Sequence, residues 1–159
     1  MRVLAIAHNT FRESIRDKVL YVLLFFAAAS ILGAKALGWI SIGQDIKVVK
    51  DISLASTSLF GVLIAIFVGT SLLYKEMDKR TLYTIVSQPM HRWEFVVGKY
   101  LGLVALLALS TAGMGAVSAL YVVVLGGEIG LSYLLAVLLI FWKLLLVTAF
   151  ALLMSSLSS

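Results

Sequence analysis

The chain has 159 residues, of which 62% are hydrophobic and 13% are charged, and its formal net charge is +5. Soluble domains contain about 45–50% apolar and about 25% charged residues, so this composition excludes a soluble enzyme, a disordered tail, collagen and a secreted disulfide scaffold. There is no cysteine, which excludes a thiol nucleophile and a cysteine-based zinc site. The mean hydropathy of +1.07 indicates an integral membrane protein.

Residues 1–18 are predicted to form an amphipathic helix with an apolar face and a polar face. The apolar face consists of Val3, Leu4, Ala7, Phe11 and Ile15. The polar face consists of Arg2, Asn9, Arg12, Glu13, Arg16 and Asp17. We expect this helix to lie in the headgroup plane on the cytoplasmic side of a membrane. The alternative is a soluble helix that covers a cytoplasmic partner.

Four segments are long and apolar enough to cross a bilayer, which takes about 20 residues. They are residues 19–42, 52–74, 100–127 and 131–154, and together they form a transmembrane domain over 19–154. Each is predicted to be helical, because a lipid-exposed backbone must satisfy its own hydrogen bonds. The predicted fold is therefore an all-α integral membrane protein. It has an N-terminal amphipathic helix, four transmembrane helices and a short cytoplasmic helix between the second and third.

The lysines and arginines predict the orientation of the chain, because positive residues concentrate on the cytoplasmic side. Nine of them lie before the first span or between the second and third, namely Arg2, Arg12, Arg16, Lys18, Lys75, Lys79, Arg80, Arg92 and Lys99. The loops on the opposite side contain only two, Lys47 and Lys50. We therefore expect both termini and the 75–99 loop to be cytoplasmic. The positive balance serves topology, and no nucleic-acid partner is expected.

The search for catalytic and cofactor-binding residues is negative. The sequence has no glycine-rich loop of the kind that holds ATP phosphates. His8 and His91 lie in different polar segments, without a second histidine or cysteine beside them to share a metal. Every carboxylate lies outside the predicted spans, which leaves no acidic pair for intramembrane chemistry. We expect no catalytic residue, no metal and no cofactor in this chain, and we predict that it is not an enzyme.

The 75–99 loop is predicted to contain a short helix across the cytoplasmic ends of two spans. Asp78 is suited to accept hydrogen bonds at the start of this helix. Leu82, Ile85 and Val86 follow at helical spacing and give it one apolar edge. Pro89 cannot continue the helix, and a second helix can start there and run into the third span. The alternative is an ordinary connecting loop.

The loop contains Lys75-Glu76-x-Asp78-x-x-Thr81-Leu82, then Ser87-x-Pro89-x-x-Arg92-Trp93-Glu94, then Gly98-Lys99. This pattern resembles the cytoplasmic loop of ABC type-2 transporter permeases. The amphipathic N-terminal helix and the order of the spans are also similar to that family, most of all to its multi-copper enzyme maturation branch. Arg80 departs from the glycine of many relatives. Members usually have six spans, so the chain is expected to be truncated after its cytoplasmic end at residues 155–159.

The resemblance implies a permease that couples ATP hydrolysis to transport of an unidentified substrate. A cytoplasmic ABC ATPase subunit would bind ATP and Mg, and a second permease subunit, identical or different, would complete a dimer in a prokaryotic plasma or inner membrane. The implied contacts with the ATPase are Glu76, Asp78, Thr81, Leu82, Ile85, Val86, Pro89 and Arg92. The rival hypotheses are a four-helix membrane scaffold or sensor that binds a cytoplasmic partner without transport, and an intramembrane enzyme.

Small residues recur every four positions in two spans, a pattern that lets helices approach closely. The second span has Ser53, Thr57, Gly61, Ala65 and Gly69, and the third has Ala108, Ala112 and Ala116. These stripes are suited to a dimer seam or a sliding gate, or to static packing inside one subunit.

Lys143 lies near the middle of the fourth span, where insertion of a lysine costs about 2.5–3.5 kcal/mol. Lys35, by contrast, can extend to the headgroups. No carboxylate of this chain is deep enough to pair with Lys143. The sequence predicts that it faces a polar cavity, a cluster of carbonyl groups or an acidic residue from outside the chain. A role in a membrane pathway, a structural role and a shifted helix register all remain open.

Overall fold

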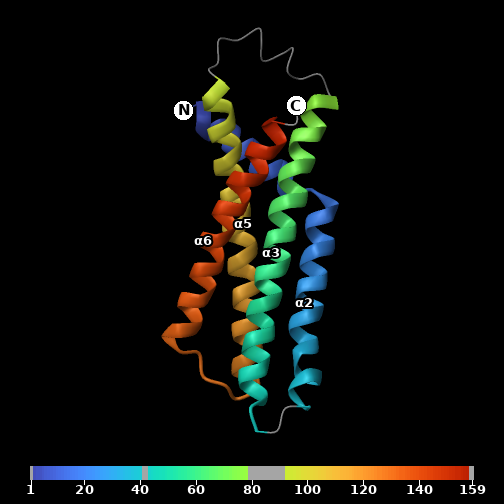
Figure 1. Ribbon diagram of the computed structural model, residues 1–159, viewed down its shortest axis with the longest axis vertical. Coiled ribbons are helices and arrows are strands. Elements are labelled where there is room, and N and C mark those ends of the chain that lie inside the picture. Colours follow the sequence, from blue (N-terminus) through green and yellow to red (C-terminus); the bar gives the residue numbers. More distant parts are fainter. Residues whose placement is uncertain (1, 41–42, 79–91, 158–159) are drawn as a thin grey trace.

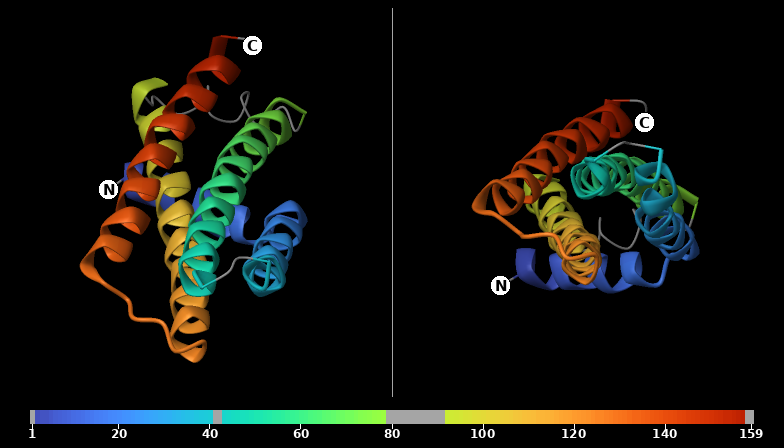
Figure 2. Two further views of the ribbon diagram at one scale, coloured as in Figure 1. Left: turned by 60° about the horizontal axis from the view of Figure 1, so that its bottom comes forward. Right: turned by 90° about the horizontal axis from the view of Figure 1, so that it is seen from below.

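The computed structural model describes residues 2–40, 43–78 and 92–157, and all regular structure in these ranges is helical. The helices are α1 (Arg2–Ile15), α2 (Lys18–Gly38), α3 (Asp45–Asp78), α5 (Arg92–Val124) and α6 (Leu131–Leu157). The four longer helices lie side by side along the length of the molecule, and the chain ends lie at one end of the bundle (Figure 1). Seen along the bundle, α1 lies across the other helices at that end (Figure 2).

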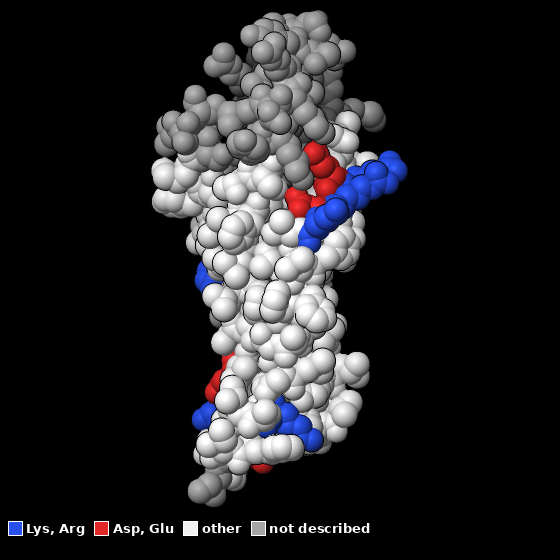
Figure 3. Space-filling model, turned by 90° about the vertical axis from the view of Figure 1, so that its right-hand side faces the viewer, with Lys and Arg blue, Asp and Glu red and all other residues white. Residues whose placement is uncertain are grey.

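Four of these helices are long and apolar enough to cross a membrane, which confirms the predicted number of spans. The apolar segments are Lys18–Gly38, Asp45–Ser71, Trp93–Val124 and Leu131–Met154. On the face shown in Figure 3, the middle of the molecule is white apart from one blue patch at its edge. This mostly uncharged stretch suits the hydrocarbon layer, because charged side chains are costly there.

The helix bounds extend beyond the predicted apolar segments at the end that carries α1. There α3 continues to Asp78, and α5 already begins at Arg92. At the opposite end α5 stops at Val124, where Gly126 has a φ of +81°. The amides of Gly126 and Gly127 donate to the carbonyls of Val123 and Val122, each at 2.9 Å. This is the hydrogen-bond pattern with which a left-handed glycine ends a helix.

The main hydrophobic core lies between the four long helices, with α3 in contact with α2, α5 and α6. Its buried side chains include Ile64 and Val68 of α3, Leu103 and Leu107 of α5, and Leu144 of α6. A smaller cluster of Ala34, Val49 and Val122 closes the end opposite α1. Because α2 and α6 each contribute mainly one face to this packing, they expose more of their surface than α3 and α5 do.

Candidate functional site

The candidate site is the end of the bundle where α3 stops and α5 starts. Glu76 and Asp78 lie in the last turn of α3, and Arg92 is the first residue of α5. The predicted contacts Thr81, Leu82, Ile85, Val86 and Pro89 lie outside the described residues, so the short helix expected there stays a prediction. What the structure does describe is how the two helices that flank this segment are held.

Helix α1 packs on α5 at two glycines of α5. Gly98 and Gly102 lie one turn apart on the same face of α5. A Cβ at Gly98 would lie 2.8 Å from the Cβ of Ile6, and one at Gly102 would lie 2.7 Å from the carbonyl oxygen of Ala7. Both distances are too short for a side chain, so α1 can approach this closely only because both positions are glycine.

The buried face of α1 overlaps the predicted apolar face, since Phe11 and Ile15 pack against the main core, but it is shifted around the helix. Thr10 and Ser14 are buried, whereas Leu4 is 69% exposed. The Ser14 hydroxyl donates to the Thr10 carbonyl at 2.7 Å, which satisfies it without a partner on another helix. The close approach at the two glycines of α5 brings Ile6 and Thr10 of α1 against them, and this contact fixes which face of α1 is buried. The spacing of Gly98 and Gly102 was the sequence signal for this contact, and sequence reasoning missed it.

Lys99 lies between these two glycines and is 3% exposed. Its Nζ lies 4.6 Å from the centre of the Phe95 ring, and the carboxylate of Glu13 on α1 interacts with it electrostatically. A buried cation is stable only where nearby groups compensate for its lost hydration. Glu13 supplies part of that compensation and so adds an electrostatic connection between α1 and α5.

The connection to α3 runs through Asp17, in the two-residue turn between α1 and α2. Its Oδ1 accepts a hydrogen bond from the amide of Val19 at 3.0 Å, which caps the start of α2. Its Oδ2 accepts one from the Ser71 hydroxyl of α3 at 3.2 Å. Asp17 was predicted on the exposed polar face of the N-terminal helix, but α1 ends at Ile15 and Asp17 is only 8% exposed. Its position beyond the helix end allows one carboxylate to serve two helices.

Lys143 lies midway along α6 and is exposed at the seam between α6 and α3. Its ammonium group donates a hydrogen bond to the hydroxyl of Ser58 on α3. The sequence predicted a cavity, carbonyl groups or an acidic residue beside Lys143, whereas its partner is a serine hydroxyl of the neighbouring helix. A part for Lys143 in a membrane pathway stays a prediction.

The small residues predicted for helix packing lie in two different environments. On α3, Gly61, Ala65 and Gly69 are buried inside the bundle, and a Cβ at Gly61 would lie 2.7 Å from the Cδ1 of Leu144. On α5, Ala112 and Ala116 are exposed and line a shallow groove of about 400 Å³ beside α6. The stripe on α3 therefore faces neighbours in the same chain, whereas these two alanines face outward.

A family model described as ABC-2 family transporter protein matches residues 4–159. The match includes almost all of α1 and the whole of the four long helices, so it covers the site described above. No curated protein matches the chain.

Proposed function

The chain belongs to the ABC-2 family of transporter proteins, and we propose that a separate ATPase subunit drives it to move a substrate across a membrane. Family membership and four apolar membrane-length helices make it a permease component of an ABC transporter. The observation that carries the proposal is the way α1 joins the two helices on either side of residues 79–91. The multi-copper enzyme maturation branch remains a prediction, as do the substrate and the direction of transport.

In this proposal the ATPase acts on the chain through residues 79–91 and the ends of α3 and α5 that flank them. ATP favours one arrangement of the ATPase subunits, and a loop bound to them has to follow. The displacement enters the membrane at the end of α3 and the start of α5, the two helices to which α1 is bound. Energy passes between two sites only where both bias the same two-state element. The element proposed here is the unit made of α1, α3 and α5.

Two contacts would keep this unit together as it moves. The close approach at Gly98 and Gly102 holds α1 to α5 without intervening side chains. The hydrogen bond from Ser71 to Asp17 holds the α1–α2 turn to α3. A displacement of either long helix would therefore shift α1 and the start of α2 with it. ATP and Mg would be bound by the partner subunit, and this chain would contribute no catalytic group.

The test compares a double variant in the segment between α3 and α5 with a single control substitution at the other end of the bundle. The tagged chain is purified from its host membranes, and the co-purified ATPase is quantified together with vanadate-sensitive ATP hydrolysis in proteoliposomes. We expect Ile85→Asp combined with Asp78→Ala to reduce the retained ATPase at least about tenfold, as loss of an apolar contact of about 1.5–3 kcal/mol implies. Ile40→Asp serves as the control, because Ile40 is 77% exposed at the end of α2 farthest from α1.

Each outcome bears on the proposal. Retention of the ATPase and of its activity in the double variant would mean that the loop is a connector only. If the unaltered chain retains no ATPase, the membrane scaffold or sensor becomes the better hypothesis. Equal losses in the loop variant and in Ile40→Asp would show that any added carboxylate disturbs the complex, which would also contradict a contact specific to the loop.

A further inference from the structure

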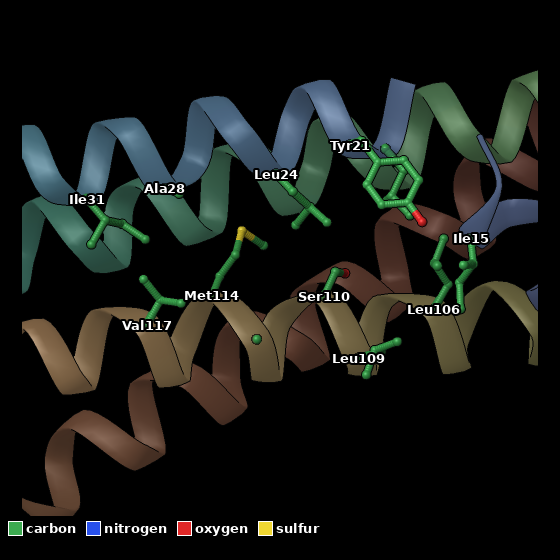
Figure 4. Close-up of a pocket in the computed structure, with 12 residues that line it drawn as sticks. Ile15, Tyr21, Leu24, Ala28, Ile31, Leu106, Leu109, Ser110, Met114 and Val117 are labelled. Carbon is green, nitrogen blue, oxygen red and sulfur yellow. The ribbon is translucent and has the colours of Figure 1, made fainter. Parts of the chain in front are cut away.

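A groove with a volume of about 330 Å³ lies between α2 and α5 (Figure 4). Its floor is formed by buried side chains, namely Leu20, Ile31, Leu106, Ser110 and Met114. Its rim is formed by exposed residues, namely Tyr21, Leu109, Gly113 and Val117. The floor is therefore inside the bundle, whereas the rim opens sideways toward the surface that lipid covers.

The groove exists because α2 and α5 pack on other helices more than on each other. The main partner of α2 is α3, and the main partners of α5 are α1 and α3. Small residues on both walls, Ala28 and Gly113, leave the space between them open. A Cβ added at Gly113 would meet no atom within 4 Å. The space is a property of the packed bundle and would accept additional atoms without displacing any residue.

The length of the groove corresponds to one leaflet of a bilayer. Its lining on α2 runs from Leu20 to Ile31, and its lining on α5 runs from Leu106 to Val117. Each stretch is about 16 Å long at about 1.5 Å per helical residue. The hydrocarbon of one leaflet is about 15 Å thick, half of about 30 Å. In Figure 4, Ile31 and Val117 mark one end, and Tyr21, Ile15 and Leu106 mark the end beside α1.

The lining of the groove is almost entirely apolar, so it favours an apolar ligand over a polar one. The hydroxyl of Ser110 already donates to the carbonyl of Leu107 at 3.2 Å. The remaining polar side chain of the lining is Tyr21, which lies on the rim near the end that α1 closes. An alkyl chain would gain dispersion contacts along the full length of the floor. A polar solute would lose its hydration there without compensation.

Three cationic residues lie close in the sequence to the residues that line the end of the groove beside α1. Lys18 lies one turn before Tyr21 on α2, Arg12 lies one turn before Ile15 on α1, and Arg16 lies in the turn between these helices. All three are exposed, and none is ion-paired within the part of the chain that the structure describes. Arginine and lysine at this depth attract the phosphate of a lipid headgroup.

We propose that this groove holds one acyl chain of an anionic glycerophospholipid from the leaflet on the side of α1. The acyl chain lies against Leu24, Ala28 and Met114, and the phosphate lies near Arg16 and Lys18. The bound lipid completes the packing between α2 and α5 and makes the stability of the bundle depend on lipid. This lipid site does not depend on ATP-driven transport, since it follows from the packing of the helices alone.

The first experiment measures whether a phospholipid stays with the purified chain. The complete chain is reconstituted with dioleoyl phosphatidylglycerol, exchanged into mild detergent and weighed intact by native mass spectrometry. Gly113→Leu places a side chain in the groove, and we expect it to lower lipid occupancy at least about tenfold, as overfilling a packed site does. Gly33→Leu is the matched control, because its Cβ would also meet nothing and Gly33 does not line the groove.

The second experiment tests the headgroup. We expect Arg16→Gln combined with Lys18→Gln to weaken retention of phosphatidylglycerol by up to about 30-fold, at about tenfold for each 1.4 kcal/mol. Dioleoyl phosphatidylcholine should be affected less, because its headgroup has no net charge. Lys47→Gln, an exposed site at the far end of the bundle, should change neither. Equal retention of the two lipids by the unaltered chain would overturn the assignment of an anionic lipid.

A third measurement keeps the proposal testable if Gly113→Leu does not fold. A photoreactive benzoyl-phenylalanine replaces Leu109 on the rim, and the cross-linked product is identified by mass. A lipid adduct that excess phosphatidylglycerol increases supports the site. Cross-linking to a polypeptide would show that a transmembrane helix occupies the groove, and this result would overturn the proposal. Unchanged lipid occupancy in a folded Gly113→Leu variant would overturn it as well.

Discussion

Two stretches of α5 carry glycine, and their surroundings differ completely. At Gly98 and Gly102 helix α1 lies so close that a single added carbon would collide with the Ile6 side chain or the Ala7 carbonyl. At Gly113 the same carbon would meet nothing, and an apolar groove opens beside α2. Glycine in a membrane helix therefore marks either a close contact between helices or a space that lipid can enter. The position of the neighbouring helix determines whether a glycine lies at a close contact or beside a space, and the glycine alone does not.

The largest change in stability is expected at Gly102, where α1 is in close contact with α5. Gly102→Ala should lower the free energy of unfolding by about 2–3 kcal/mol, because the new methyl group meets the carbonyl of Ala7, which cannot rotate away. Thermal unfolding in detergent, followed by circular dichroism, measures the loss. Gly33→Ala is the control, since a Cβ there meets no atom. An unchanged unfolding temperature for Gly102→Ala would mean that α1 does not sit tightly on α5.

A second, smaller effect is expected where the α1–α2 turn meets α3. Asp17→Ala should cost about 1–2 kcal/mol, because it removes the cap of α2 and the acceptor for Ser71. Asp17→Asn retains an oxygen that can cap the helix, so it should cost less. Chemical unfolding of both variants and of Ser71→Ala measures their stabilities. The comparison separates the contribution of the α2 cap from that of the hydrogen bond to α3. Equal losses for the alanine and asparagine variants would contradict the capping role.

An intermediate case lies at Gly61 of α3, where the close neighbour is the end of a flexible side chain. Gly61→Ala should cost about 1 kcal/mol, since the Cδ1 of Leu144 can move aside at the price of poorer packing. Leu144→Val should lower stability by itself, yet it should relieve the cost of Gly61→Ala when the two are combined. A double-mutant cycle measures this coupling. Strict additivity of the two changes would show that α3 and α6 do not meet there.

The smallest change in stability, with the opposite sign, is expected at Gly113 beside the groove. Gly113→Ala should leave stability unchanged or raise it by up to about 1 kcal/mol, because alanine favours a helix over glycine and nothing obstructs its methyl group. The same thermal unfolding assay serves, and its control is Gly102→Ala on the same helix. A loss of stability at Gly113 similar to that at Gly102 would remove the distinction between the two stretches.

The orientation of α1 shows where prediction from the pattern of residues was incomplete. A helix over most of residues 1–18 was expected, and α1 occupies Arg2–Ile15. Its contact with α5, however, buries Thr10 and Ser14 and leaves Leu4 exposed. An amphipathic pattern indicates which face prefers water. It contains no information about a second helix whose glycines allow a close approach at particular residues of the first.

Lys143, near the middle of its apolar segment, is a second case in which the sequence pattern does not predict the contact with another helix. Its depth could be read from its place in an apolar segment, and that depth made a polar neighbour necessary. Its hydrogen-bond acceptor is Ser58, 85 residues earlier in the chain. No local spacing connects the two residues. They meet because α3 and α6 pack side by side.

Hydropathy alone determined that four segments are helices long and apolar enough to cross a membrane. In hydrocarbon each backbone polar group needs a partner within its own segment, so length and apolarity are sufficient evidence. The tertiary structure decided which faces meet, why Asp17 is buried, and that α2 and α5 leave a groove. These features depend on the distance between helices that are remote in sequence. That distance is set by the packing of all the helices together.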